Sequence, residues 1–417
     1  MVQHEQKGRG LALTLQWKRC VVHKKTVLAA APVMIGALAL SSCSSSKSKP
    51  ASAGGGGNKP SYTIGFQGPL TGPNAQLGIN IDNAVKLAVA QANAKGDLPF
   101  TLKVAEADDQ GDPAKGPTAA QQLIGNSNVM GVVGPTFSGA TKAAQPLFTQ
   151  ANLASVSASA TNSSLTDPAN GFKTFFRIVP PDSTQGTAAA DYMAKALKAK
   201  SVYLIDDKSD YGVGLCGNIK TQLTADGVNV VSDSVAAGTN DYSAAATKVA
   251  NSGTQAMYYC GYYADAAPLA KALKNTPYTG KTLSGDGSND PKFISLAGSA
   301  GEGWQFTCPC LSAAASTDPT TQQFVKDYTA SANQPPGTYS PEGFDVANTL
   351  ITVMKPLGTN VTRGAVVTGL RSVDFKGLTK QIKFQPNGEV TEKSIFVYQV
   401  KNGQITEVGT VDKLIAS

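Results

Sequence analysis

The sequence predicts an α/β protein of two lobes, each built on a parallel β-sheet flanked by helices. Short apolar runs alternate along the chain with segments whose apolar residues repeat at helical spacing. This alternation occurs in two series, joined by an extended, proline-terminated segment at 175–181. Two similar series favour two lobes with a cleft between them. In open α/β sheets ligands bind beyond the carboxyl ends of the strands, so residues that follow a strand are the candidates for a site.

The first series contains four expected strands and one strongly periodic helix. The strands are 62–66, 100–105, 129–133 and 153–157, and the helix is 82–94. Asp112 followed by Pro113 is typical of a helix N-cap and first turn. In the second series we expect strands at 201–205, 228–235, 256–260 and 282–284, and helices at 186–199, 214–225, 242–251 and 265–274.

The N-terminal segment has the layout of an export signal. Lys24 and Lys25 precede an apolar run over 26–40, and the run leads through two serines to Cys43. That ending resembles the lipobox of bacterial lipoproteins, so residues 1–42 are predicted to be a signal peptide and Cys43 to be lipidated. The run is too short to span a bilayer, whereas two acyl chains on a cysteine anchor a protein firmly. An ordinary cleaved signal with a chance cysteine is the alternative.

Composition after Cys43 narrows the function classes. Residues 43–59 are rich in serine, glycine and lysine and are predicted to be a flexible tether at the outer face of the cytoplasmic membrane. Both histidines, His4 and His23, precede Cys43, so the mature chain has no imidazole for a catalytic triad or a metal site. Six of the 36 basic residues and one of the 29 acidic residues also precede it, which leaves a net charge of +2. Nucleic acid is therefore not expected as a partner, and we expect no metal and no cofactor.

Four cysteines, Cys216, Cys260, Cys308 and Cys310, remain in the exported part of the chain. In an oxidising compartment they permit three disulfide pairings. The pairing of Cys216 with Cys260 is favoured, because the first follows a strand and the second ends a strand expected beside it. Cys308 and Cys310 would then close a tight loop across Pro309, and a zinc site of thiolates is the rival interpretation.

Polar residues after the strands predict two kinds of recognition. Hydroxyl-bearing residues at 136–139 and 157–161 follow strands of the first series and suit a ligand carboxylate. In the second series Tyr211, Tyr262 and Asp286 follow strands, and tyrosine faces with a carboxylate suit an ammonium group. Each has a structural alternative, because serine and threonine cap helices, tyrosines fill cores and Asp286 could brace the turn 285–287.

Several segments resemble the leucine/isoleucine/valine-binding proteins of ABC importers. They are GPNAQLG at 72–78, SASATNSSLT at 157–166, DKSDYGVGL at 207–215 and YYCGYYAD at 258–265, and the resemblance runs in order from about Tyr62 to near the end of the chain. It implies a type I periplasmic-binding-protein fold with two Rossmann-like lobes and three hinge crossings, near Pro180, Pro309 and Pro386. Lobe one would comprise 60–179 and 310–386, and lobe two 180–309 and 387–417.

The same resemblance implies roles for eight residues. Ser138, Thr161 and the backbone at Ser159 correspond to the clamp on the α-carboxylate of an amino acid. Asp286 corresponds to the acidic partner of the ammonium group. The other four correspond to residues around the ammonium and the side chain: Leu77, Tyr211, Tyr262 and Phe344. Asp286 is one methylene shorter than the glutamate expected there, and Gly111 and Phe137 stand where some members pair two cysteines.

The resulting hypothesis is a monomeric, lipid-anchored solute-binding protein. It captures a branched-chain or other aliphatic amino acid and delivers it to the permease of an ABC transporter without catalysing a reaction. One alternative is a receptor for an amide, a urea or an aromatic acid on the same scaffold. The other is a secreted enzyme that uses carboxylates such as Asp109 and Asp286.

Overall fold

Two sheets with the same order of parallel strands form the part of the chain that the computed structural model describes, residues 59–416. The first sheet has the order β2-β1-β3-β4-β5, and the parallel strands of the second have the order β7-β6-β8-β9-β10. In each sheet the strand order reverses at one point, between β1 and β3 in the first sheet and between β6 and β8 in the second. This is the arrangement of a doubly wound α/β sheet. The predicted signal peptide, Cys43 and the tether up to residue 58 lie outside the described residues.

Of the strands in residues 59–416, β1 to β4 and β6 to β9 lie close to where the apolar runs predict them, β5 lies in the extended segment 175–181, and β10 to β14 were not predicted. Their bounds are β1 Ser61–Gly68, β2 Thr101–Asp108, β3 Val129–Val133, β4 Ala154–Ser157, β5 Phe175–Arg177, β6 Ser201–Asp206, β7 Asn229–Ser234, β8 Ala256–Cys260, β9 Lys281–Ser284, β10 Gln305–Cys308, β11 Phe375–Lys376, β12 Gln381–Ile382, β13 Phe396–Lys401 and β14 Gln404–Thr410. Strand β13 pairs antiparallel with β10, and β14 pairs antiparallel with β13. The second sheet therefore ends in an antiparallel hairpin that the sequence analysis did not predict.

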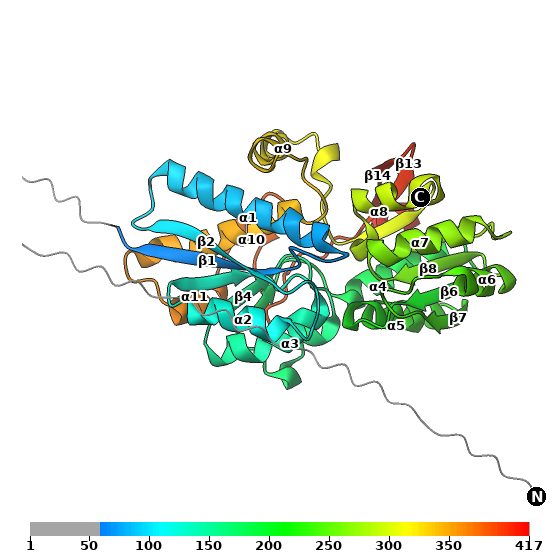
Figure 1. Ribbon diagram of the computed structural model, residues 1–417, viewed down its shortest axis with the longest axis horizontal. Helices are drawn as coiled ribbons and strands as arrows, with labels where there is room; N and C mark the ends of the chain where they lie inside the picture. Colours follow the sequence, from blue (N-terminus) through cyan, green and yellow to red (C-terminus); the bar gives the residue numbers. More distant parts are fainter. Residues whose placement is uncertain (1–58, 417) are drawn as a thin grey trace, which may run out of the picture. The chain divides into compact units, whose positions relative to one another are not determined.

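Helices cover both faces of each sheet (Figure 1). They are α1 Ala75–Lys95, α2 Gly116–Gly125, α3 Ser138–Gln150, α4 Asp182–Asp191, α5 Asp210–Ala225, α6 Ser243–Asn251, α7 Tyr263–Lys274, α8 Pro291–Ala297, α9 Pro319–Ala332, α10 Ser340–Met354, α11 Arg363–Leu370 and α12 Val411–Ala416. Helix α10 packs against α1, α2 against α3, α4 against α5, and α7 against both α6 and α8. None of the helices in residues 59–416 is both long and apolar enough to cross a membrane.

The chain passes between the two sheets more than once. Helices α10 and α11 follow β10 in the sequence but pack against β3, and α11 also packs against β4. Strand β13 then returns to the second sheet. The described chain therefore crosses after β5, after β10 and before β13, and each sheet is completed by distant segments. The lobe boundaries 60–179, 310–386, 180–309 and 387–417 remain a prediction.

Helix starts are where the sequence analysis was least accurate. Helix α1 begins at Ala75 rather than at residue 82, and α5 begins at Asp210 rather than at residue 214. In α5 the Ser209 side chain accepts a hydrogen bond from the Gly212 N–H at 2.9 Å, so a polar first turn precedes the apolar periodicity. The N-cap assignment of Asp112 was wrong. Its carboxylate accepts from the Ala114 N–H within a turn, and α2 starts later, at Gly116.

Both disulfides lie in or beside the second sheet. Cys216 of α5 is bonded to Cys260 at the end of β8, with 5.7 Å between the Cα atoms. Cys308 at the end of β10 is bonded to Cys310, with 5.1 Å between the Cα atoms. This pairing is the one the sequence analysis favoured, and it occupies all four sulfurs that the zinc interpretation would need.

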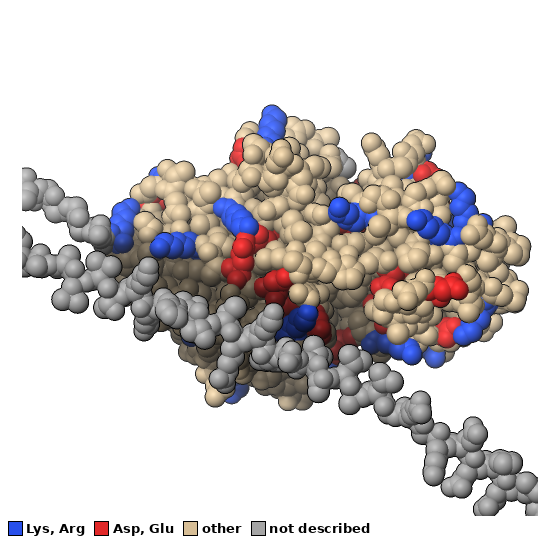
Figure 2. Space-filling model, viewed as in Figure 1, with Lys and Arg blue, Asp and Glu red and all other residues tan. Residues whose placement is uncertain are grey.

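On the face drawn in Figure 2, basic and acidic side chains are interspersed.

Candidate functional site

A crevice lies at the carboxyl ends of strands from both sheets. It is lined by Leu77, Thr136, Phe137, Ser138, Ser159, Tyr211, Tyr262, Asp286, Gly287 and Tyr339. Six of the eight predicted ligand-binding residues are among them, and Thr161 and Phe344 are not. The cavity that these side chains leave is only about 10 Å³, room for roughly one water molecule. The two walls of the crevice are therefore in contact.

Hydroxyl groups and a helix N-terminus form the first wall. Ser138 begins α3, the helix that follows β3, so the partial positive charge of the helix dipole lies at the crevice. The Ser138 Oγ accepts a hydrogen bond from the Asn162 N–H at 3.1 Å, and the Ser159 Oγ donates to the Thr136 carbonyl at 2.7 Å. These bonds hold the loops after β3 and β4 together. The wall presents groups suited to an anion.

A buried carboxylate forms the second wall. Asp286 is 3% exposed. Its Oδ2 accepts from the Tyr339 hydroxyl at 2.7 Å, and its Oδ1 accepts from the Tyr211 hydroxyl at 2.9 Å and the Gln185 Nε2 at 2.7 Å. Burial raises the pKa of Asp286, and these three hydrogen bonds oppose the rise. No ion pair joins this carboxylate to a basic side chain within residues 59–416. A cationic ligand group at this position would supply the missing charge.

The turn that carries Asp286 requires glycine on both sides. A Cβ added at Gly285 would lie 2.4 Å from the Tyr211 hydroxyl, and one added at Gly287 would lie 2.9 Å from the Gly261 carbonyl. Gly287 also donates its N–H to the Tyr211 hydroxyl at 3.2 Å. Asp286 does not brace this turn with its side chain, because its carboxylate oxygens accept from residues outside the turn.

Aromatic rings from the two sheets meet in the crevice. Phe137, after β3, stacks on Tyr262, which precedes α7, with ring centroids 4.3 Å apart and an interplanar angle of 27°. Tyr211 also packs against Tyr262, with ring centroids 5.2 Å apart. Leu77 of α1 is buried and lines the same crevice. Part of the crevice lining is therefore apolar and aromatic.

A second buried carboxylate, Asp182, lies behind the crevice. It begins α4, is fully buried, and neither of its carboxylate oxygens has a hydrogen-bond donor. Burial raises the pKa of Asp182 to about 8; the charge of Asp286 adds to this rise, and Thr161 and Arg177 oppose it. Thr161 is also fully buried and its hydroxyl makes no well-aligned hydrogen bond, although its carbonyl accepts from the Asp182 N–H at 2.7 Å.

Phe344, like Thr161, is a predicted residue that does not line the crevice. It lies on α10, and its ring packs against Phe324 of α9 with centroids 5.1 Å apart. Conversely, the sequence analysis did not assign Tyr339, Gln185 or Phe137 to the site. Phe137 could have been found, because it lies in the segment 136–139 that the sequence analysis singled out after the strand 129–133. Tyr339 follows a loop rather than a strand, so its position in the sequence carries no such signal.

These features define a class of protein: two doubly wound lobes with a ligand crevice at the carboxyl ends of their strands. Residues 61–404 match the family model described as "Periplasmic binding protein". The chain belongs to this family of solute-binding proteins and has the type I periplasmic-binding-protein fold.

Relatives of known name cover most of the chain. This chain is 29% identical to the Leu/Ile/Val-binding protein BraC3 of Rhizobium johnstonii, and the alignment covers 82% of this chain and 92% of BraC3. It is 26% identical to the leucine-, isoleucine-, valine-, threonine- and alanine-binding protein of Pseudomonas aeruginosa, over 83% and 91% of the two chains.

Two solved structures are similar in fold and sequence. The leucine-binding protein LivK of Thermotoga maritima has a TM-score of 0.77 and 25% identity, over 84% of this chain and 98% of that one. The branched-chain amino acid transporter substrate-binding protein LivJ of Streptococcus pneumoniae, in complex with isoleucine, has a TM-score of 0.76 and 26% identity. The match covers 84% of this chain and 99% of LivJ.

Proposed function

We propose that this chain binds a branched-chain or other aliphatic amino acid in the crevice and delivers it to the permease of an ABC transporter. The observation that carries the proposal is the pairing of opposite walls. Ser138 at the start of α3 offers a hydroxyl and the helix dipole to a carboxylate. Asp286 on the opposite wall has neutral donors but no basic partner among residues 59–416. A free amino acid carries both complementary charges. The names of the relatives support the same ligand class.

Ligand entry requires the walls to separate. The cavity of about 10 Å³ has room for roughly one water molecule and not for an amino acid, and contacts join the walls directly. Besides the Phe137–Tyr262 stack, the Asn80 Nδ2 of α1 donates to the Asp290 Oδ2 at 2.9 Å. Hinge opening would break such contacts, and a bound zwitterion would restore them by bridging the two walls. The closed form is then the form that a permease recognises.

Calorimetric titration with the standard amino acids tests the assignment. We expect heat with leucine, isoleucine or valine, and no heat with any amino acid at millimolar concentration would refute it. The variant Asp286→Asn is expected to lower the affinity about 100-fold, because it removes a charge from a buried ion pair. Asp265→Asn is the matched control, since Asp265 is a buried carboxylate of α7 that accepts from Tyr242 and does not line the crevice.

A receptor for a flat amide, urea or aromatic acid is the second candidate. The stacked rings of Phe137 and Tyr262 favour it, because a planar ligand could insert between them. Such a ligand has no ammonium group, so Asp286→Asn would leave its affinity unchanged. The two candidates thus differ in the response to one substitution.

Export and anchoring complete the proposal. Proteins of this family act outside the cytoplasm, and the Leu-Ser-Ser-Cys motif at Cys43 supports a lipoprotein on the outer face of the cytoplasmic membrane. A monomeric state remains a prediction. The variant Cys43→Ala should move the protein from the membrane fraction to the soluble fraction. Retention of that variant in the membrane would contradict lipidation at Cys43.

A further inference from the structure

The two walls of the crevice are bonded to each other along two rims. On one rim the Lys142 Nζ of α3 lies 2.8 Å from the Asp210 Oδ1 of α5, with 53% and 34% of the two side chains exposed. An ion pair so exposed to solvent contributes little to closure. On the other rim α1, which packs on β1 and β2, meets the start of α7 and the turn after β9. That rim includes the deeply buried pair Asn80 and Asp290, so it is better placed to hold the walls together.

The first turns of α1 are bonded across the crevice to α7. The Gln76 N–H donates to the Tyr263 hydroxyl at 3.1 Å, and the Ala264 N–H donates to the Asn74 Oδ1 at 3.2 Å. Leu77, which lines the crevice, belongs to the same stretch of α1. These bonds join segments that follow different sheets, so they form only when the two walls touch.

Asn80 makes the most buried polar contact of this rim. It is 1% exposed, and its Nδ2 donates to the Asp290 Oδ2 at 2.9 Å and to the Thr338 carbonyl at 3.2 Å. Its Oδ1 accepts from the Gln76 Nε2 at 2.9 Å. The loop before α10 approaches so closely that a Cβ added at Gly337 would lie 2.4 Å from the Asn80 Nδ2. Both N–H groups of the Asn80 amide are therefore in use in the closed form.

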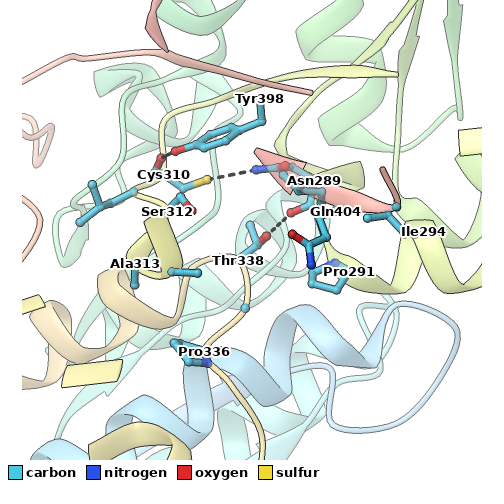
Figure 3. A pocket seen from close by; sticks show the side chains of 15 residues that line it. Asn289, Pro291, Ile294, Cys310, Ser312, Ala313, Pro336, Thr338, Tyr398 and Gln404 are labelled. Atoms are coloured by element: carbon cyan, nitrogen blue, oxygen red, sulfur yellow. Dashed lines mark hydrogen bonds between the residues drawn. The ribbon is translucent and has the colours of Figure 1, made fainter. Parts of the chain in front are cut away.

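The acidic partner of this amide lies in the turn that carries Asp286. Asp290 follows Asp286 by four residues, is 1% exposed, and accepts from the Lys292 N–H at 2.9 Å through its Oδ1. One residue earlier, the Asn289 carbonyl accepts from the Thr338 hydroxyl of the loop before α10 (Figure 3). The turn that offers Asp286 to a ligand is thus held against the opposite wall at its far end.

We propose that Asn80 is a positioning residue whose bond to Asp290 latches the crevice shut around a ligand and slows its release. This inference rests on the proposed function, because it concerns how the same ligand is held. The bond joins the two walls, so it exists in the closed form, and water replaces it when the walls separate. Only the closed form encloses a ligand. Weakening the bond therefore speeds dissociation and lowers the affinity.

The variant Asn80→Ala tests the latch directly. It leaves the Asp290 carboxylate buried with one donor fewer, and only in the closed form. We expect the dissociation constant for leucine to rise about 10- to 100-fold, the value of a hydrogen bond to a charged group, through faster dissociation in stopped-flow measurements. Asn93→Ala is the matched control, since the Asn93 amide of the same helix bonds to the backbone of Leu102 in β2, on the same wall. It should lower the free energy of unfolding and leave the dissociation rate unchanged.

The variant Asn80→Asp adds a signature that a merely structural residue would not give. It places two carboxylates within hydrogen-bond distance in the closed form, so that form holds a proton between them, whereas the open form has both in water. The affinity for leucine relative to the parent protein should therefore fall as the pH rises, at least about tenfold between pH 5 and pH 7. Lys292 of α8 and Tyr263 of α7 also face Asp290, but they are common to both proteins.

Exchanging the two partners should remove this pH dependence. The double variant with Asn80→Asp and Asp290→Asn again pairs one carboxylate with one amide across the crevice. Asparagine at position 290 keeps an oxygen for the Lys292 N–H, because asparagine is as good an N-cap as aspartate. We expect the ratio of its leucine affinity to that of the parent protein to be constant from pH 5 to pH 7.

Equal leucine dissociation rates in the parent protein and Asn80→Ala would overturn the proposal. So would an affinity ratio for Asn80→Asp that does not change from pH 5 to pH 7, or one that changes equally in the double variant. If Asn80→Asp does not fold, the comparison of Asn80→Ala with Asn93→Ala decides alone.

Hydrogen exchange of the ligand-free protein separates the latch from the proposed function. The Gln76 and Ala264 N–H groups bond across the crevice, so their exchange reports opening without any ligand. Both should exchange about tenfold faster in Asn80→Ala than in the parent protein. If the parent protein binds no amino acid, the proposed function fails and this comparison tests the latch by itself. Equal exchange in the two proteins would then refute it.

Discussion

Replacing Asp182 with asparagine should change how stability depends on pH. Asp182 is fully buried at the start of α4, and no donor within residues 59–416 makes a well-aligned hydrogen bond to its carboxylate oxygens. Burial raises its pKa from 3.8 to about 8; the nearby charge of Asp286 adds to the rise, and Arg177 and the Thr161 hydroxyl oppose it. The folded protein therefore keeps Asp182 protonated at pH values where the unfolded chain has released that proton.

The magnitude follows from this difference in bound protons. Between pH 4 and pH 8 the folded form holds about one more proton at Asp182 than the unfolded form. The contribution of Asp182 to the free energy of unfolding is then fully present below about pH 4 and falls by about 1.4 kcal/mol per pH unit until pH 8. Asparagine does not titrate. The stability of Asp182→Asn relative to the parent protein should therefore rise by about 3 kcal/mol between pH 5 and pH 7.

Urea unfolding at pH 5, 6, 7 and 8 measures this difference. Other buried carboxyls with raised pKa values, such as Asp82 and Glu342, titrate in both proteins and cancel. Asp226→Asn, an exchange at an exposed residue that ends α5, controls for the substitution itself. A stability difference between Asp182→Asn and the parent that stays constant from pH 5 to pH 8 would refute the reasoning, because it would mean that Asp182 is ionised in the folded protein throughout.

Three further substitutions follow from the structure. Glu389→Gln leaves the fully buried Arg177 without its counter-charge and should lower the free energy of unfolding by about 3–5 kcal/mol in urea; a loss below about 1 kcal/mol would contradict a buried ion pair. Replacing Cys216 and Cys260 together by serine opens a loop of 44 residues and should cost about 4 kcal/mol in the same assay, with no further loss when a reductant is added if this disulfide dominates. Phe137→Ala enlarges the apolar end of the crevice and should shift the ratio of leucine to phenylalanine affinity about tenfold toward phenylalanine in calorimetry; an unchanged ratio would show that Phe137 does not limit the side-chain space.

Strands were predicted well because their signal is local. A run of apolar residues as short as Val129–Val133 is buried on both faces of a parallel sheet, so its composition alone identifies it. The first turns of helices were missed because polar residues there weaken the local apolar signal. In α1 the segment that precedes residue 82 contains Gln76, Gly78 and Asn80, and Asn80 is buried because it donates to Asp290 of the other lobe. Leu77 and Ile81 of the same segment are buried at helical spacing, so the apolar periodicity was present there but was obscured by the polar residues between them.

Residues that follow strands were predicted to face a site, and most of them do. Ser138, Ser159, Tyr262 and Asp286 meet in one crevice because the carboxyl ends of parallel strands share one edge of a sheet. Phe344 was assigned through the resemblance to a family rather than by its place after a strand. The structure packs its ring on Phe324, because α9 covers that face of α10.

The sequence by itself determined the two-lobed α/β class, the strands β1 to β4 and β6 to β9, and the polar residues at their ends, since each depends on the period and composition of neighbouring residues. The tertiary structure alone decided what surrounds Asp286. Its donors Tyr339, Tyr211 and Gln185 lie 53, 75 and 101 residues away along the chain. Whether a buried carboxylate is satisfied by neutral donors or by a cation depends on which distant segments pack against it, and no local pattern encodes that proximity.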